Sequence, residues 1–226
     1  MLSDGLRITV KVLPSLYPQG GEKVLVYHTT GKVIPTGKLP IDVGVVVCNC
    51  TTMAAIGEYL ATGKPLVEKC VTVDGGAVKE SQNVIVPVGT KISDLFAFCG
   101  GLTEQPAKII YGGPMMGITV PNPDCSVLKN TNGVLALSEK EAKLPKTTAC
   151  IRCGSCVNTC PFSLAPLDIA EAYEKKDAEM LKVLSVDTCM ECGCCSFVCP
   201  ANRPLVQMNR LSKQLLREER QKEANK

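Results

Sequence analysis

Short apolar runs bounded by turn residues dominate the first 120 positions of the chain, a pattern that predicts strands more often than helices. Near the N-terminus the predicted strands cover 6–13, 23–28 and 43–47. A helical pattern then occupies 52–60, and Gly63-Lys64-Pro65 interrupts the chain. We therefore expect residues 1–62 to form one segment that ends at this break.

The next stretch, from 63 to 120, has the pattern of a small β-rich module with one helix. The predicted strands are 66–73, 83–88 and 108–111, and the predicted helix is 92–99. Asp74-Gly75-Gly76 is typical of a turn. Residues 121–148 contain three prolines and a run of Lys and Glu, so we expect mostly a linker there.

Helical spacing replaces the strand pattern in the last third of the chain. Apolar residues between 167 and 184 share one helical face, and a stripe of Leu205, Met208, Leu211 and Leu215 predicts a C-terminal helix with one packed face. The fold class we expect is therefore α+β and multidomain. Its predicted segments are 1–62, 63–120, 121–148, 149–204 and 205–226.

Composition narrows the function classes. Apolar residues make up 45% and charged residues 21%, which is ordinary for a folded protein, and the net charge is only +3. Aromatic residues are 4% and Trp is absent, so base-stacking platforms and a nucleic-acid partner are not expected. His28 is the single histidine, which argues against His-rich metal sites.

Cysteine is the informative residue type, with fourteen copies. The N-terminus lacks the pattern of a signal peptide, and the longest apolar run, 43–48, is too short to span a bilayer. We therefore expect a reducing, cytosolic setting, where clustered cysteines indicate metal or redox chemistry.

One cysteine pattern occurs twice, and nine of the fourteen cysteines fall within 149–204. The first copy reads Cys150-x2-Cys153-x2-Cys156-x3-Cys160-Pro161. The second copy reads Cys189-x2-Cys192-x2-Cys195-x3-Cys199-Pro200, offset by 39 residues at every cysteine. Two such runs are the signature of paired [4Fe–4S] clusters.

The spacing also predicts which cysteines share a cluster. Three cysteines two residues apart can wrap one cube, whereas the fourth is carried away by a longer step and a proline and reaches the other cube. The first predicted ligand set is Cys150, Cys153, Cys156 and Cys199. The second predicted set is Cys160, Cys189, Cys192 and Cys195.

The alternatives to this assignment are structural zinc and buried inert thiols or disulfides. Structural zinc uses paired C-x2-C motifs but has no need of the repeated run with its trailing proline. The remaining cysteines lack ligand spacing and are interpreted as bystanders, Cys194 between two ligands and the others as small core residues. These others are Cys48, Cys50, Cys70, Cys99 and Cys125.

Beyond the cysteines, longer stretches resemble the C subunits (RnfC) of the Rnf ion-translocating electron-transport complexes, which are NADH:ferredoxin oxidoreductases. The stretches that carry the resemblance are Tyr17-Pro18-Gln19-Gly20-Gly21-Glu22-Lys23, Leu39-Pro40-Ile41-Asp42-Val43-Gly44-Val45, Gly112-Gly113-Pro114-Met115-Met116-Gly117, and Cys189-Met190-Glu191-Cys192-Gly193 through Arg203-Pro204-Leu205-Val206-Gln207. The resemblance implies a partial α/β flavoprotein-like segment similar to that of complex I, a β-grasp (SLBB) module and an α-helical ferredoxin domain. We interpret the glycine-rich stretch at 112–117 as a turn in or beside the β-grasp module.

The same resemblance implies an FMN and NADH cleft. Its residues would be Tyr17, Gly20, Glu22, Asn49 and Thr52. Each has an ordinary structural alternative, such as packing for Tyr17, a turn for Gly20 and a helix cap for Asn49. The glycine-rich phosphate loop of the family would lie upstream of Met1, so the chain resembles the C-terminal part of such a protein. FMN and NADH are then expected only when that part is supplied.

These expectations define the function and its rival. The resemblance implies a non-spanning subunit at the cytoplasmic face of the membrane that passes electrons between NADH or FMN and ferredoxin or membrane subunits, coupled to ion translocation. Its expected partners are the other Rnf subunits and ferredoxin, and it contributes no catalytic side chain. The alternative is a soluble electron relay to a catabolic reductase, similar to a cobalamin-reducing or a proline-reductase-associated protein. A scaffold whose clusters only stabilise the fold is the remaining possibility.

Overall fold

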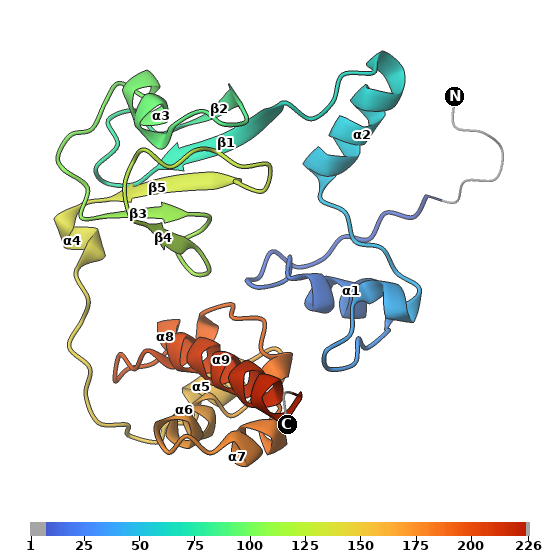
Figure 1. Cartoon of the computed structure of the whole chain (residues 1–226), viewed down its shortest axis with the longest axis vertical. Coiled ribbons are helices and arrows are strands. Elements are labelled where there is room, and N and C mark those ends of the chain that lie inside the picture. Colours follow the sequence, from blue (N-terminus) through green and yellow to red (C-terminus); the bar gives the residue numbers. More distant parts are fainter. Residues whose placement is uncertain (1–7, 225–226) are drawn as a thin grey trace. The chain divides into compact units, whose positions relative to one another are not determined.

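The computed structural model describes residues 8–224, and the chain divides into two compact units (Figure 1). One unit combines the N-terminal residues through Val47 with the chain from Cys150 onward. The other runs from Cys48 to Ala149 and contains the sheet. Each unit has a hydrophobic core of its own.

The unit at 48–149 is a mixed five-stranded sheet with a helix packed against it (Figure 1). Its strands are β1 (Glu68–Asp74), β2 (Gln82–Pro87), β3 (Lys108–Tyr111), β4 (Ile118–Val120) and β5 (Gly133–Leu137). Its helices are α2 (Cys50–Thr62), α3 (Ile92–Phe98) and α4 (Glu139–Ala142). The strand order is β2-β1-β5-β3-β4, with β1 and β5 parallel and all other neighbours antiparallel. This is the arrangement expected of a β-grasp module.

Side-chain periodicity explains how this sheet and α3 meet. Val71 and Val73 alternate with exposed residues along β1, so one face of the strand is buried. Ile92, Leu95 and Phe96 lie at helical spacing on α3 and belong to the same core. Burying one such side chain contributes about 1.5–3 kcal/mol.

Two glycine-rich turns have the places that the sequence predicts. Gly75 follows β1 with a φ of 116°, and a Cβ there would lie 2.2 Å from the Ala136 carbonyl oxygen, so only glycine fits. Gly112 and Gly117 bracket the connection between β3 and β4, and the prediction of a turn at 112–117 is confirmed.

The predicted linker at 121–148 is wrong for 133–142. Residues Gly133–Leu137 form β5, the central strand of the sheet, and α4 follows it directly. Every residue of β5 is buried or half-buried, so its apolar residues do not alternate with exposed ones. The run is also only five residues long, and its neighbours β1 and β3 are distant in sequence.

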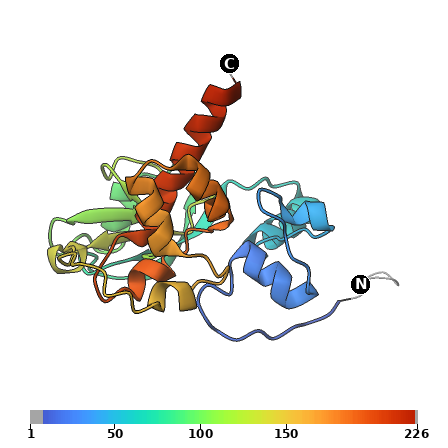
Figure 2. The ribbon, with the colours of Figure 1, turned by 90° about the horizontal axis from the view of Figure 1, so that it is seen from below.

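The other unit is mainly helical. Its elements are α1 (Glu22–Thr30), η1 (Pro40–Val43), α5 (Ser155–Asn158), α6 (Pro166–Glu174), α7 (Ala178–Val183), η2 (Val186–Thr188), α8 (Cys194–Phe197) and α9 (Leu205–Ala224). Ile169, Leu181 and Leu216 are fully buried where α6, α7 and α9 pack together. Figure 2 shows the C-terminal end of α9 projecting beyond the helices that it packs against. Within residues 8–224, no helix combines the length and hydropathy needed to cross a bilayer.

The three N-terminal strands are not present among the described residues. Residues 23–28 lie inside α1, which ends at Gly31 with a φ of 74°. Residues 8–13 and 43–47 pair with no strand, and 6–7 fall outside the described residues. A short apolar run forms a strand only when a partner edge is available, which a local pattern does not reveal.

The core of the β-grasp unit gives a stability prediction. Leu95→Ala removes a side chain that is only 1% exposed and should lower the free energy of unfolding of this unit by roughly 2–5 kcal/mol. Denaturant titration followed by far-ultraviolet circular dichroism measures the change. Ile85→Ala is the matched control, because Ile85 is 74% exposed on β2 and its loss should cost under about 0.5 kcal/mol. Equal losses for both variants would contradict the assigned core.

Candidate metal centres

The two cysteine motifs fold into loops with the same unusual backbone. Arg152 and Glu191, at the 39-residue offset, both have positive φ values, of 55° and 60°. Gly154 and Gly193 follow with φ values of 75° and 83° and precede α5 and α8. Positive φ is uncommon outside glycine, so its recurrence at matched positions indicates a conformation that the loops require.

This conformation turns backbone donors toward sulfur. The Arg152 N–H lies 3.3 Å from Cys150 Sγ, and the Glu191 N–H lies 3.4 Å from Cys189 Sγ. Hydrogen bonds of this kind stabilise a negatively charged thiolate. Each loop therefore directs one backbone donor at the first sulfur of its motif.

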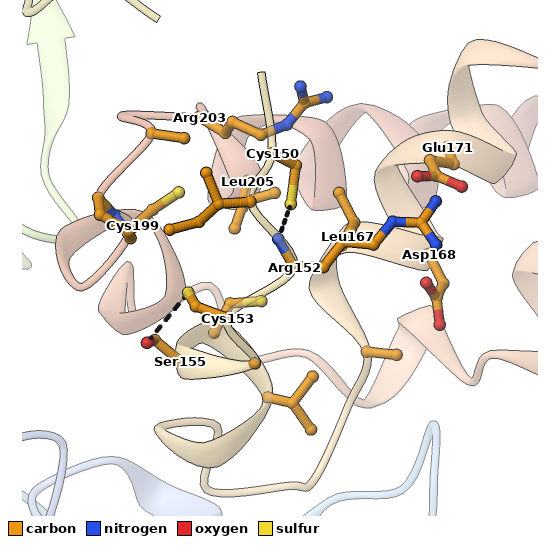
Figure 3. A pocket seen from close by; sticks show the side chains of 17 residues that line it. Cys150, Arg152, Cys153, Ser155, Leu167, Asp168, Glu171, Cys199, Arg203 and Leu205 are labelled. Carbon is orange, nitrogen blue, oxygen red and sulfur yellow. Dashed lines mark hydrogen bonds between the residues drawn. The ribbon is translucent and has the colours of Figure 1, made fainter. Parts of the chain in front are cut away.

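A cavity of about 300 Å³ opens beside the first loop (Figure 3). It is lined by the sulfur-bearing residues Cys150, Cys153, Cys156 and Cys199. Three of them come from the first motif, and Cys199 comes from the end of the second. The cavity therefore gathers the first predicted set and not the four cysteines that are consecutive in sequence.

The second cavity gathers the other set. Cys160, Cys189, Cys192 and Cys195 all line it, together with Cys194 and Asn209. It is much tighter, at about 20 Å³, so these side chains must spread to admit a cube. The crosswise exchange of the fourth cysteine is thus present in the lining of both cavities.

The spacing of the sulfurs differs from that of a single-ion site. Within residues 8–224, no three Cys, His, Asp or Glu side chains converge as ligands of one metal ion do. A tetrahedral zinc site holds every sulfur about 2.3 Å from one centre, whereas a cube binds each thiolate at a separate iron. Four sulfurs distributed around a cavity fit the larger group.

Burial raises thiol pKa values in both sets, including that of Cys156 in the first. Burial raises the pKa of the Cys195 thiol to about 12 and also raises the pKa values of Cys160 and Cys192. The hydrogen bond with Ser155 lowers the pKa of Cys153, which is exposed. The buried thiols of Cys160, Cys192 and Cys195 therefore favour their protonated form, and cluster binding there must displace those protons.

Helix α9 adds contacts to the second loop that the cysteine pattern did not predict. The Asn209 side-chain amide donates to Cys189 Sγ at 3.4 Å, and Lys213 donates to the Cys189 carbonyl oxygen. Glu191 forms ion pairs with Arg210 at 3.0 Å and with Lys213 at 2.8 Å. Burial works to raise the Glu191 pKa, but the hydrogen bonds and charges of Lys213 and Arg210 outweigh it and lower that pKa.

The remaining cysteines divide by burial. Cys194 is buried between two cysteines of the second set, and Cys99 is buried in the β-grasp core. Cys125 is half-buried and packs against that core. The interpretation as core residues is wrong for Cys48, Cys50 and Cys70, which are exposed. Exposed apolar groups are common on folded proteins, so a core cannot be assigned by residue type alone.

The residues that the resemblance assigned to flavin belong to both units. Tyr17, Gly20 and Glu22 lie at or before the start of α1, and the Tyr17 hydroxyl donates to the Cys192 carbonyl oxygen at 2.7 Å. Asn49 and Thr52 belong to the other unit. There Asn49 caps α2 by accepting a hydrogen bond from the Thr51 N–H at 2.9 Å, as its structural alternative predicts.

Three known protein families match successive segments of the chain, in the order that the sequence motifs predict. Residues 2–58 match the Nuo51 FMN-binding domain, and residues 70–119 match the SLBB domain. Residues 149–203 match the 4Fe-4S dicluster domain. The chain is thus an iron–sulfur protein with an SLBB module and a flavoprotein-like N-terminal segment.

Curated relatives identify the family more closely, and each is the C subunit of a redox complex. That of the proton-translocating ferredoxin:NAD(+) oxidoreductase complex from Clostridium ljungdahlii is 44% identical over 163 residues, 72% of this chain and 36% of that protein. That of the ion-translocating oxidoreductase complex from Rhodobacter capsulatus is 44% identical over 214 residues, 95% of this chain and 41% of that protein. That of the Na(+)-translocating ferredoxin:NAD(+) oxidoreductase complex from Acetobacterium woodii is 42% identical over 170 residues, 75% of this chain and 38% of that protein.

The chain belongs to this family of Rnf-type C subunits and has its order of domains. It spans about two fifths of the length of these relatives. The resemblance drawn from the sequence motifs is confirmed.

The crossed lining of the cavities gives a prediction for one cysteine. Cys160→Ser should damage the cluster held by Cys189, Cys192 and Cys195 and spare the one beside Cys150, because Cys160 lines the second cavity. Iron analysis and electron paramagnetic resonance of the anaerobically reconstituted chain measure the loss, with about four irons expected to remain.

Cys194→Ala is the matched control for this substitution. Cys194 is buried beside the second cavity but belongs to neither predicted set, so the variant should keep about eight irons. Loss of the cluster beside Cys150 in Cys160→Ser would contradict the crossed assignment.

Proposed function

We propose that this chain carries electrons through two [4Fe–4S] clusters as part of an ion-translocating ferredoxin:NAD+ oxidoreductase complex. The observation that carries the proposal is the gathering of two four-cysteine sets around two cavities. The proposed ligands are Cys150, Cys153, Cys156 and Cys199 for one cluster and Cys160, Cys189, Cys192 and Cys195 for the other. The relatives are C subunits of ion-translocating oxidoreductase complexes, which favours membership of such a complex over a soluble relay to a catabolic reductase.

The chemistry of the bound groups is one-electron storage at each cluster. The protein residues fix the position of the clusters and control their surroundings. Since each motif contributes ligands to both cavities, the two sites are held close together by the same backbone. Buried residues such as Ala170 and Leu205, which pack with cysteines of both sets, keep water from the space between them.

We further propose that the N-terminal segment forms part of a flavin and NADH site in the longer protein. The match of residues 2–58 to an FMN-binding domain supports this, with Tyr17, Gly20, Glu22, Asn49 and Thr52 as the proposed contacts. The hydrogen bond from Tyr17 to Cys192 supports a role for the segment next to the second cluster.

The proposed setting is peripheral to the membrane, on its cytoplasmic face. The relatives are subunits of ion-translocating complexes, and the described residues include no spanning helix. The proposed partners are the other subunits of such a complex and a ferredoxin that exchanges electrons with it.

Reversible reduction tests the electron-carrying role. The anaerobically loaded chain should take up about two electrons from dithionite and return them to an added oxidised ferredoxin, since each cluster accepts one. Optical bleaching and electron paramagnetic resonance follow both steps. Clusters that resist reversible reduction would indicate a structural role instead, and absence of the chain from membranes that contain the other subunits would favour the soluble relay.

Gly20 offers a direct test of the flavin proposal. A side chain added at Gly20 meets nothing within 4 Å, so Gly20→Val should fold but obstruct a flavin that approaches this backbone. In the longer protein we expect at least tenfold weaker FMN binding, about 1.4 kcal/mol, measured by flavin fluorescence. Gly113→Val is the control, because Gly113 is equally unobstructed but lies in the β-grasp unit. Unchanged FMN affinity in Gly20→Val would contradict the assignment.

A further inference from the structure

The cluster domain, from Cys150 through α9, consists of two halves that each contain one cysteine motif and the helix after it. The two halves have similar backbone conformations but different side chains around their sulfurs. The 39-residue offset that matches the cysteines also matches Ser163 with Asn202, whose φ values are 52° and 51°. Continued into the following helices, it aligns α6 with the start of α9. Side chains at matched positions are therefore one source of difference between the two cluster sites.

The clearest difference lies at Ala170 and its counterpart Asn209. Both are buried, at 0% and 1% exposure. Ala170 packs in an apolar cluster with Cys195 of the second set and with Cys156 and Cys199 of the first, and it offers no side-chain donor. Asn209 lines the second cavity and directs its amide N–H at Cys189 Sγ.

The Asn209 side chain is oriented with its amide N–H toward sulfur. Its Oδ1 is buried without a hydrogen-bond partner, a cost that a structural asparagine normally avoids. Against a thiolate only the N–H side of the amide is attractive. Asn209 therefore leaves its carbonyl oxygen without a hydrogen bond while its amide N–H donates to sulfur. We take this as an indication that the N–H···S contact is the function of this side chain.

At positions related by the 39-residue offset, the two halves also carry side chains of opposite charge. Around the second loop, Arg210 and Lys213 face the single carboxylate of Glu191. The residues at the same positions of the first half are Glu171, Glu174 and Arg152. Asp168 and Arg203 also line the first cavity, as do Arg152 and Glu171 (Figure 3). Arg203 in addition pairs with Glu174 at 3.5 Å, so carboxylates outnumber cations on this side.

One contact would instead stabilise negative charge at the first set. The Ser155 hydroxyl lies 3.3 Å from Cys153 Sγ in the first set, and its counterpart in the second half is the Cys194 thiol, a weaker donor. Cys153 is exposed, however, so water competes for this sulfur. A buried amide donor acts in a lower dielectric and has the stronger effect on charge.

Hydrogen bonds to sulfur and positive charge both favour the reduced, more negative state of a cluster. We propose that Asn209 is a positioning residue that raises the reduction potential of the cluster held by Cys160, Cys189, Cys192 and Cys195 above that of its twin. This rests on the proposed ligand sets. The consequence is that a single electron entering the pair rests on the second cluster, beside the segment that contains Tyr17.

The test is a redox titration of the full chain with both clusters loaded anaerobically. Dithionite supplies one electron to each cluster, and electron paramagnetic resonance follows the two signals, which Cys160→Ser assigns by removing one. Asn209→Ala should shift the second cluster to lower potential by about 59 mV, a tenfold change in its reduced-to-oxidised ratio. The first cluster should keep its potential, and Gln207→Ala, an exposed position on the same helix, should change neither.

A second variant guards against loss of the fold. Ala170 shows that alanine fits the matched buried position, and Asn209→Leu fills the asparagine volume without a donor, so at least one variant should retain eight irons. A wild-type second cluster at or below the potential of the first would overturn the inference. So would an unchanged potential in the variants, or failure of both to bind iron, since Asn209 would then be structural. A wild-type chain that binds no iron would instead contradict the proposed function itself.

Discussion

The exchange of one cysteine between two repeated loops is the constraint on which the cluster domain depends. Cys199 reaches back to the cavity of the first motif and Cys160 reaches forward to that of the second. In the proposed ligand sets each cavity takes three cysteines from one loop and one from the other, so the two halves must fold together to form either set. The packing of α6 against α9, with Ile169 and Leu216 fully buried, supplies the rigid frame that holds both loops at this distance.

The two cysteine loops have the same backbone conformation, so their electrostatic difference comes from their side chains. Arg152 and Glu191 share a strained conformation whose effect is to aim an N–H at the first sulfur of each motif. The conformation is common to both loops, but the charges of the two residues are opposite. The helix that follows each motif then has the complementary charge, acidic in α6 and basic at the start of α9. A single repeated scaffold thereby provides two unequal electrostatic environments.

The β-grasp unit depends on strand pairing between segments that are distant in sequence, and it contains no internal repeat of the cysteine loops. β5 lies between β1 and β3, so the sheet closes only after the strand that begins at Gly133 returns to Thr72 and its neighbours. Gly75 permits this approach because no side chain separates it from the Ala136 backbone.

Spacing along the sequence was enough to predict the family, the iron–sulfur chemistry and the helices at 52–60 and 92–99, and it predicts the crossed cysteine sets. The single helical face expected over 167–184 is instead divided between α6 and α7, which pack against each other. It could not assign the N-terminal run at 23–28, where three consecutive apolar residues fit a helix or a strand equally well. It also missed β5, whose partners are distant, and the contacts of Asn209, Lys213 and Tyr17 with the second loop. Only the tertiary structure decided these, because such contacts depend on which surfaces meet after folding, and no local periodicity records that meeting.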